Sequence, residues 1–187
     1  KLASGHLRKT VALARKKNLD FVSTDIRNFG EQNHVSPVNI NFYDELFANR
    51  LLGCSLFKKN VLLAEPYDPA FRNGYEDWEL WIRLLKNNYK GEVIHEPLYL
   101  YRRKLESRFT KTYMERSRHI RKIREKHREL YRPEELARLK SENKEGRVVP
   151  VRLYELHYQL GLRFPVVASL LMRIYLASRP FMRRLTQ

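Results

Sequence analysis

Residues 73–88 read NGYEDWELWIRLLKNN, and this stretch decides the fold. Its apolar residues follow two helical faces, one with Tyr75, Trp78, Ile82 and Leu85 and the other with Leu80, Trp81 and Leu84. A helix that is apolar nearly all round is buried on every side. The pattern therefore predicts an interior helix from Tyr75 to about Asn88, ended by the Asn-Asn pair and the following Gly91.

Three acidic residues, Glu76, Asp77 and Glu79, lie in the first turn of this predicted helix, directly after an irregular loop over residues 65–74. The helix dipole stabilises acids at a helix N-terminus, which is one explanation of the turn. The neighbouring tyrosine and two tryptophans favour another, in which aromatic rings stack on sugar rings while a carboxylate accepts a hydroxyl proton. Because adjacent helical residues diverge by about 100°, only one of Glu76 and Asp77 can point squarely at a given substrate atom.

Strands and shorter helices are predicted on either side of the interior helix. They are, in chain order, a helix over residues 7–17, a strand over 20–24, a loop or edge hairpin over 28–41, a short helix around 46–47, a strand over 51–57 and one or two strands over 93–101. Pro97 interrupts the last of these, and proline is tolerated only at a sheet edge or a strand start. Strands alternating with helices indicate an α/β fold.

The chain becomes basic and helical after Arg102. Apolar residues from Met114 to Tyr131 form a narrow stripe on a basic helix, and residues 133–135 (PEE) are typical of the first turn of another. Two further amphipathic helices are predicted, one with Leu153, Leu156 and Leu160 on its apolar face and one over residues 166–175. This part is therefore predicted to be all-helical.

The composition excludes several classes of protein. Of the 187 residues, 43% are hydrophobic and 12% aromatic, too many for a disordered chain, and no apolar run reaches the roughly 20 residues of a membrane-spanning helix. A single cysteine, Cys54, allows no intrachain disulfide and no cysteine-rich zinc site, so we expect a cytoplasmic protein. The chain opens at Lys1 without a methionine or signal peptide, and we expect that it starts inside a longer protein.

The net charge of +16 suggests an anionic partner, such as nucleic acid, an anionic membrane or a phosphorylated substrate. The charge is uneven, since residues 18–101 carry eight basic and twelve acidic side chains whereas residues 102–128 carry twelve basic and three acidic ones. A protein that grips nucleic acid more often places its basic residues on the body of the fold, beside a recognition helix. We therefore do not expect a nucleic-acid partner.

Four short motifs lie in order between residues 51 and 103. They are LLGCSLFKK at 51–59, YDP at 67–69, GYEDWELWIRL at 74–84 and IHEPLYLYRR at 94–103. Their order and spacing resemble the acceptor-side half of family 2 glycosyltransferases, over about residues 18–108. The resemblance implies a partial GT-A-like mixed sheet with flanking helices over residues 1–108, followed by the all-helical, basic extension over residues 109–187.

The resemblance implies transfer of a sugar from a nucleotide-sugar donor to a hydroxyl of a glycan or lipid-linked acceptor, with inversion at the anomeric carbon. Asp77 is then the general base, and Glu76 is its partner in the catalytic Glu-Asp pair. Single displacement at this carbon needs a carboxylate that takes the acceptor proton, which agrees with the assignment. The further substrate-binding residues that we predict are Tyr75, Trp78, Cys54 and Ser55, with Trp78 near the acceptor. For Trp78 and Cys54, burial in the core is the alternative.

The departing nucleotide diphosphate needs a counter-charge, usually a divalent metal. The family's Asp-x-Asp motif has no match in the chain. We therefore expect residues ahead of Lys1 to hold most of the Mg²⁺ or Mn²⁺ ligands, and we predict no metal ligand within the chain. We also expect the chain alone to be inactive. Many relatives carry a histidine where this chain has Lys104. A protonated lysine contacts phosphate but does not ligate a metal. Arg102, Arg103 and Lys104 are predicted diphosphate contacts, with a merely solvated position as the alternative.

The Gln-x-x-Arg-Trp motif of processive polysaccharide synthases is absent, which predicts a non-processive transferase in polysaccharide biosynthesis. The apolar segment from Phe164 to Ser178 is followed by arginines, so it is suited to an anionic surface on the inner face of the cell membrane. Packing on the rest of the chain, or on a second copy in a homo-oligomer, is the alternative. A different function, a non-enzymatic basic module for nucleic acid, a membrane or a protein partner, explains the net charge but not the acidic middle of the chain.

Overall fold

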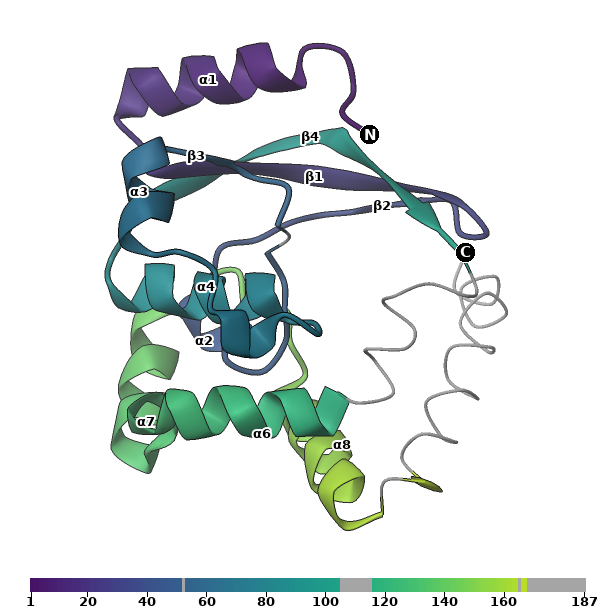
Figure 1. Cartoon of the computed structure of the whole chain (residues 1–187), viewed down its shortest axis with the longest axis vertical. Coiled ribbons are helices and arrows are strands. Elements are labelled where there is room, and N and C mark those ends of the chain that lie inside the picture. Colours follow the sequence, from purple (N-terminus) through teal and green to yellow (C-terminus); the bar gives the residue numbers. More distant parts are fainter. Residues whose placement is uncertain (52, 105–115, 165, 168–187) are drawn as a thin grey trace.

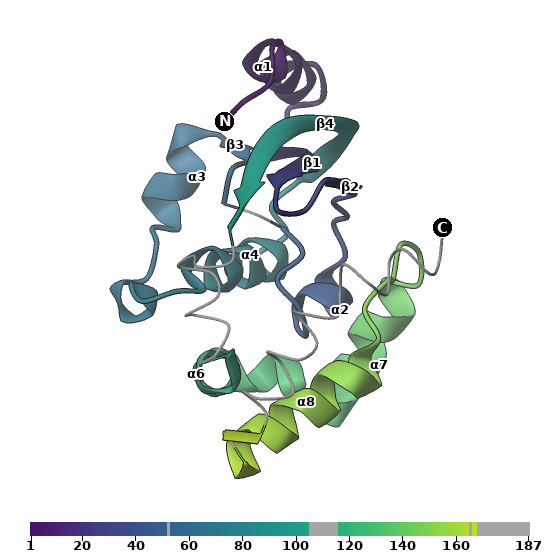
Figure 2. The same ribbon diagram turned by 90° about the vertical axis from the view of Figure 1, so that its right-hand side faces the viewer.

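The computed structural model describes residues 1–51, 53–104, 116–164 and 166–167. Its elements form layers (Figure 1): helix α1 (His6–Lys17) covers one face of a mixed sheet, helix α4 (Glu76–Lys86) lies against the other face, and the C-terminal helices lie beyond α4. The view turned by 90° shows the same order (Figure 2). The α/β class predicted from the sequence is confirmed.

Strand β1 (Phe21–Gly30) is the centre of the sheet. Strand β4 (Gly91–Arg103) pairs with it in parallel along one edge, and strands β2 (His34–Ser36) and β3 (Leu56–Phe57) pair antiparallel with it along the other. The hairpin predicted over residues 28–41 is therefore confirmed. The strand predicted over residues 20–24 was too short, because β1 continues for as long as β2 and β4 supply backbone partners.

Pro97 lies in an irregular part of β4. Thr24 pairs with Ile94 and Ile26 with Tyr99, so β4 has more residues than β1 between these two pairs. Such a bulge leaves residues outside the ladder, which is where a proline without a backbone N–H is tolerated. Residues 93–101 thus belong to one strand, and the chain from Lys1 to Ala3 runs along its outer edge, where the Ala3 N–H donates to the Leu98 carbonyl at 2.9 Å.

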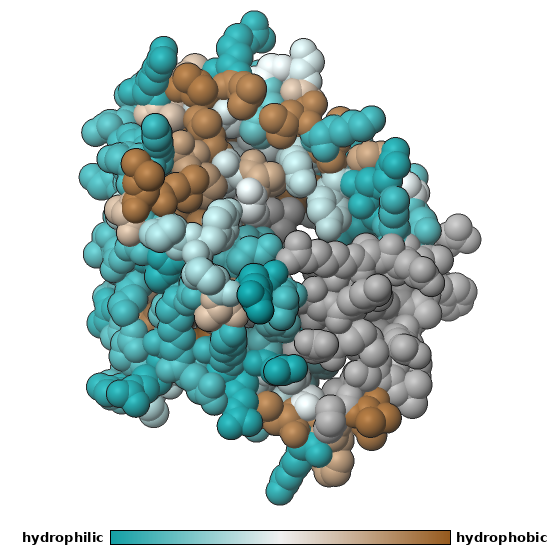
Figure 3. All heavy atoms as spheres, in the orientation of Figure 1, coloured by the Kyte–Doolittle hydropathy of each residue, from teal (hydrophilic) through white to brown (hydrophobic). Residues whose placement is uncertain are grey.

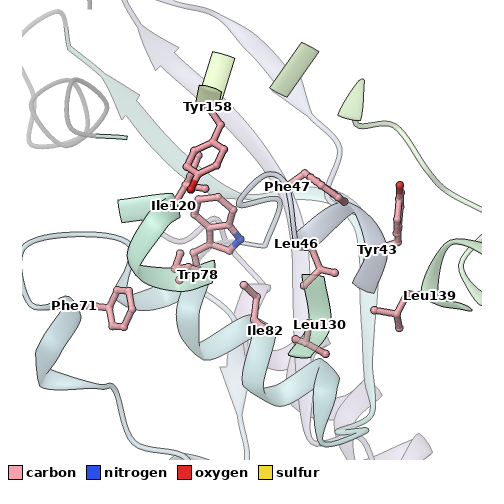
Figure 4. Packing of buried hydrophobic residues seen from close by; sticks show 11 residues of the cluster. Tyr43, Leu46, Phe47, Phe71, Trp78, Ile82, Ile120, Leu130, Leu139 and Tyr158 are labelled. Atoms are coloured by element: carbon pink, nitrogen blue, oxygen red, sulfur yellow. The ribbon is translucent and has the colours of Figure 1, made fainter. Parts of the chain in front are cut away.

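Helix α4 is buried between two layers, which explains why it is apolar nearly all round. On the side of the sheet, the Trp81 ring lies 5.0 Å from that of Phe21, and Leu80 and Leu84 belong to the same cluster. On the opposite side, Trp78 and Ile82 pack among the C-terminal helices (Figure 4). The helix predicted from Tyr75 to Asn88 is confirmed.

The segments between the sheet and α4 differ from the prediction in two places. The short helix expected around residues 46–47 is α2 (Phe42–Glu45), which starts earlier because the Asn41 side chain accepts the Asp44 N–H at 2.9 Å and caps it. The strand predicted over residues 51–57 is wrong except for β3. Helix α3 (Lys59–Ala64) and the 3-10 helix η1 (Pro69–Phe71) then lead into α4.

The C-terminal part is helical, as predicted, within the described residues. It comprises α6 (Arg116–Lys126), the 3-10 helix η2 (Arg128–Tyr131), α7 (Pro133–Glu142) and α8 (Val151–Arg163). Met114 and the predicted boundary at residues 108 and 109 lie outside the described residues, as does the helix over 166–175 apart from its first two residues. One hydrophobic cluster joins this part to α2 and α4 and includes Ile123, Leu130, Leu139 and Tyr158 together with Trp78. Figure 4 shows Tyr158 beside Trp78.

Helix α8 turns a different face to this cluster than the sequence indicated. Tyr158 and Gly161 are buried, and the Arg124 guanidinium of α6 lies 4.1 Å from the centre of the Tyr158 ring. Leu153 and Leu156, on the predicted apolar face, are 61% and 56% exposed. The helix is apolar on two sides, and the aromatic side that stacks with Arg124 faces the core.

Candidate active site

The carboxylate of Asp77 lies half-buried at the start of α4. Its Oδ1 accepts hydrogen bonds from the Asn49 side-chain amide at 3.0 Å and from the Trp78 backbone N–H at 2.8 Å. The backbone N–H of Gly53 is a third donor. Among the residues that the structure describes, no Lys, Arg or His forms an ion pair with Asp77. Within the described residues, the group is thus held by neutral donors.

Burial raises the pKa of Asp77 above its ordinary value of 3.8, and the charge of the adjacent Glu76 raises it further. The donors from Trp78, Asn49 and Gly53 oppose this rise only in part. A carboxylate with a raised pKa binds a proton more readily, which is what a general base must do. The surroundings of Asp77 therefore suit it to accept a hydroxyl proton.

The residues that surround Asp77 come largely from the chain between α2 and β3. A Cβ atom built on Gly53 would lie 3.4 Å from the Asp77 Cβ and 3.8 Å from the Tyr67 hydroxyl, so this backbone passes close to both. The pKa of Tyr67 is raised by burial and by the charges of Asp77 and Glu76. Sequence reasoning missed Asn49 and did not assign Tyr67 a role. No sequence signal distinguishes Asn49 from the other asparagines of the chain.

Tyr75 and Trp78 occupy the inner side of the acidic turn. Tyr75 adopts a left-handed backbone conformation, with φ of 62°, and its ring lies 5.3 Å from that of Trp78 and 5.0 Å from that of His119. Trp78 is 1% exposed, and its indole N–H donates to the Glu45 carbonyl at 2.5 Å. A ring this enclosed has no open face on which a sugar could stack, which favours a core position for Trp78 over a place beside the acceptor.

Cys54 and Ser55 lie in the turn before β3, not in the predicted strand. Burial raises the pKa of the Cys54 thiol to about 12, and the charge of Asp77 contributes to the rise. The thiol is therefore protonated at neutral pH, which does not suit a nucleophile. The Ser55 hydroxyl forms a short hydrogen bond with that of Ser23 on β1. Cys54 thus lies close enough to Asp77 to be affected by its charge, and Ser55 connects this turn to the sheet. Substrate binding by these two residues stays a prediction.

The basic residues at the end of β4 diverge. Side chains alternate between the two faces of a strand, so Arg102 and Arg103 point in opposite directions. The Arg103 guanidinium lies 4.6 Å from the centre of the Tyr101 ring, and its Nε donates to the Asn28 side chain at 2.7 Å. The Tyr101 ring lies 6.1 Å from that of Tyr99, and both pack with the cluster beneath the sheet. Arg103 therefore shares the face of the sheet that carries α4.

Arg102 and Lys104 are exposed, and the Arg102 guanidinium lies 5.4 Å from the centre of the Phe29 ring. Arg102 thus packs its charged group on the face opposite Arg103. Of the three predicted diphosphate contacts, Arg103 is the one whose direction fits the side of the sheet on which Asp77 lies.

The described residues contain neither a cluster of metal-ligating side chains nor a helix that could span a membrane. Within them, no group of three or more His, Cys, Asp or Glu side chains could hold a metal ion. We expected the ligands of a divalent metal to lie mostly outside the chain, so Mg²⁺ or Mn²⁺ stays a prediction. In the same part of the chain, none of the helices has the length and apolar character needed to cross a membrane.

No protein-family model matches this chain, and no curated protein matches it. The resemblance to family 2 glycosyltransferases therefore depends on the four sequence motifs alone.

Proposed function

We propose that the chain is the acceptor-binding half of an inverting, non-processive glycosyltransferase of family 2, with a partial GT-A-like sheet and Asp77 as general base. The observation that carries the proposal is the Asp77 carboxylate: half-buried, with a raised pKa, held by N–H donors and without an ion pair among the described residues. A purely structural acid at a helix N-terminus gains by staying exposed to solvent, whereas burial of Asp77 favours its protonated form.

The reaction that follows from this proposal is a single displacement. Asp77 takes the proton from an acceptor hydroxyl as the oxygen attacks the anomeric carbon of the donor, and the bond from that carbon to the diphosphate breaks. Basic side chains of the protein stabilise the charge that develops on the diphosphate, together with a divalent metal when one is bound. Glu76 stays beside Asp77 and raises its proton affinity.

The experiment that tests this function is a sugar-transfer assay. The native protein, including any residues ahead of Lys1, is incubated with a panel of nucleotide-sugars and hydroxyl acceptors, and the anomeric configuration of the product is read by proton NMR. We expect a product whose configuration is inverted relative to the donor. A product with retained configuration would exclude Asp77 as the base of a single displacement, and tight binding to nucleic acid with a steep salt dependence would favour the non-enzymatic alternative.

Because Arg103 and Arg102 point to opposite faces of the sheet, we predict different effects when each is replaced. We expect Arg103→Ala to raise the KM for the nucleotide-sugar by about tenfold to a hundredfold, because a charge-assisted hydrogen bond to phosphate contributes roughly 1.5–3 kcal/mol. Arg102→Ala is the matched control, since Arg102 faces the other side of the sheet, and we expect a change of less than about twofold. Equal effects of the two substitutions on KM would contradict a directed diphosphate contact.

We also propose that α8 contributes to binding at an anionic membrane surface. Leu153 and Leu156 are exposed on its outer side, and Arg152 and Arg163 are exposed beside them. Figure 3 shows hydrophobic side chains at the foot of the molecule, where α8 ends. An apolar stripe flanked by arginines is suited to the headgroup region of anionic lipid. Most of the segment from Phe164 to Ser178, for which this surface was first predicted, lies outside the described residues.

The membrane proposal is tested by co-sedimentation with vesicles that contain phosphatidylserine. We expect the double substitution Leu153→Gln with Leu156→Gln to weaken binding at least about tenfold, because each buried leucine side chain contributes roughly 1.5–3 kcal/mol. The matched control substitutes Leu7 and Leu63, which are 58% and 71% exposed on α1 and α3. Unchanged binding by the α8 variant would exclude this surface, and a concentration-dependent change in mass would favour a homo-oligomer.

A further inference from the structure

Side chains of three different elements donate hydrogen bonds to the backbone at the end of α2. The backbone carbonyls of residues 45, 46 and 47 accept hydrogen bonds from the Trp78 indole of α4 at 2.5 Å, the Tyr131 hydroxyl of η2 at 2.8 Å and the Arg116 guanidinium of α6 at 3.1 Å. Carbonyl groups at the end of a helix have no partner within the helix. Here each of the three is satisfied by a side chain, so this part of the backbone has a fixed position.

The Glu45 side chain fixes the next part of the same chain. Its carboxyl group is 0% exposed, and its two oxygens accept the backbone N–H of Arg50 at 3.2 and 3.0 Å and that of Leu51 at 3.3 Å. Arg50 and Leu51 lie between Asn49 and Gly53, the two residues of this segment that donate to Asp77. A change in the backbone at Arg50 and Leu51 therefore displaces the donors of the proposed base.

We infer that Glu45 is a positioning residue for Asp77, acting through the backbone of Arg50 and Leu51 and the donors Asn49 and Gly53. The inference deepens the proposed function, on which it rests for its catalytic meaning. Glu45 lies in a different element from Asp77, and its carboxyl group is fully enclosed. It orients the base and takes no part in the reaction itself.

Stability alone does not account for a glutamate at this place. Burial raises the pKa of Glu45 well above its ordinary value, although the N–H groups of Arg50 and Leu51 oppose the rise, and the nearby charge of Asp77 raises it further. Enclosing a second carboxyl group near the first therefore costs free energy. A glutamine of the same shape would avoid that cost, and an amide oxygen at the place of Oε2 could accept both N–H groups. Its NH2 group would then stand at the place of Oε1, where Glu45 accepts the Arg50 N–H, and would set one donor against another.

The side-chain amide of Asn49 provides a direct measurement of this positioning. Its proton and nitrogen NMR signals report the hydrogen bond to Asp77, and the Asp77→Ala variant gives their position when that bond is absent. We expect Glu45→Gln to move these signals towards the Asp77→Ala position, whereas Ile123→Val, a control in the same hydrophobic cluster, leaves them unchanged. Signals of Glu45→Gln that coincide with those of the wild type would overturn the inference.

A titration of the wild type keeps the inference testable if Glu45→Gln does not fold. Because Glu45 holds Arg50 and Leu51, the Asn49 side-chain signals should change with two transitions, one shared with the Asp77 carboxyl carbon and one shared with the Glu45 carboxyl carbon. If the Glu45 carboxyl carbon shows its own transition and the Asn49 signals do not follow it, Glu45 does not act on these donors and the inference is overturned.

Activity separates this inference from the proposed function. In the transfer assay we expect Glu45→Gln to lower kcat by about tenfold to a hundredfold with little change in the donor KM, because a small displacement of a catalytic group has effects of this size. If the wild type has no transferase activity, the proposed function is refuted. If Glu45→Gln nevertheless moves the Asn49 signals, the positioning of Asp77 by Glu45 still holds. An active Glu45→Gln enzyme with unchanged kcat would overturn the inference alone.

Discussion

Asp77→Asn should lower kcat for sugar transfer by about 10²- to 10⁴-fold while leaving the KM for the nucleotide-sugar nearly unchanged. A positioned general base contributes acceleration of about this size. The asparagine keeps the shape of the side chain, and its oxygen can still accept the N–H groups of Asn49 and Trp78. Only the proton acceptor is lost. Glu76→Gln on the adjacent residue is the comparison variant, and it should lose much less activity, because Glu76 only raises the proton affinity of Asp77.

The raised pKa of Asp77 also predicts how Asp77→Asn changes stability, which distinguishes a general base from a residue that only stabilises the fold. Because the folded state raises this pKa above 3.8, Asp77 favours the folded state at low pH, and this contribution is lost as the pH rises through the folded pKa. At neutral pH Asp77→Asn should therefore be no less stable than the wild type in thermal denaturation. A clearly destabilised Asp77→Asn, or inactive Glu76→Gln beside active Asp77→Asn, would contradict the assignment.

Glu79→Ala should lower the free energy of unfolding by about 3–5 kcal/mol, the usual effect of removing one partner from a buried ion pair. Glu79 is 0% exposed, and its carboxylate contacts Arg83 at 2.9 Å, Lys126 at 2.7 Å and His127 at 3.0 Å. Removal takes the carboxylate partner from His127, whereas Arg83 keeps Glu65 and Lys126 keeps Asp68. It also removes the ion pairs that join α4 to the end of α6. The measurement is urea denaturation at neutral pH.

The control for Glu79 is a solvent-exposed pair that joins similar parts of the chain. Lys86 of α4 and Glu129 of η2 form a salt bridge at 2.5 Å, with side chains 41% and 40% exposed. Glu129→Ala should cost less than about 1 kcal/mol, because solvent screens exposed pairs. Similar losses for both variants would show that burial does not strengthen the Glu79 interactions.

Glu79 also makes the stability of the protein depend on pH. Burial alone would raise the pKa of Glu79, but hydrogen bonds from His127 and Lys126 and the charge of Arg83 lower it below its ordinary value of 4.5. A lowered pKa means that the stabilisation is present above pH 4.5 and is lost as the pH falls through the folded pKa. The difference in stability between the wild type and Glu79→Ala should therefore shrink in acid.

The interior helix and its acidic turn could be predicted because their signals are local. Apolar residues on both sides of α4 predict a helix buried between two layers, and the structure has the sheet on one side and α6 to α8 on the other. Asp77 could be named as the candidate base from the motif around it. In contrast, Asn49 and Glu45 act through contacts with residues distant along the chain, and their positions leave no periodic pattern in the sequence.

Packing also decided which side chains are buried where the sequence had indicated others. Helix α8 has leucines on one side and tyrosines on the other, and the tyrosine side is buried because Arg124 stacks on Tyr158. Trp78 and Trp81 both lie beside the acidic turn, and the sequence favoured Trp78 as the residue near a sugar. The structure places Trp78 in the core because its indole N–H finds the Glu45 carbonyl there.

By itself the sequence determined the α/β class, the buried helix with its acidic first turn, and the helical character of the C-terminal part, because each depends on the spacing of neighbouring residues. Only the tertiary structure decided where β1 and β4 end, which side of α8 is buried, and which donors hold Asp77. These features depend on backbone partners and side chains far apart in the chain, and the free energy of such contacts exists only once the layers have come together.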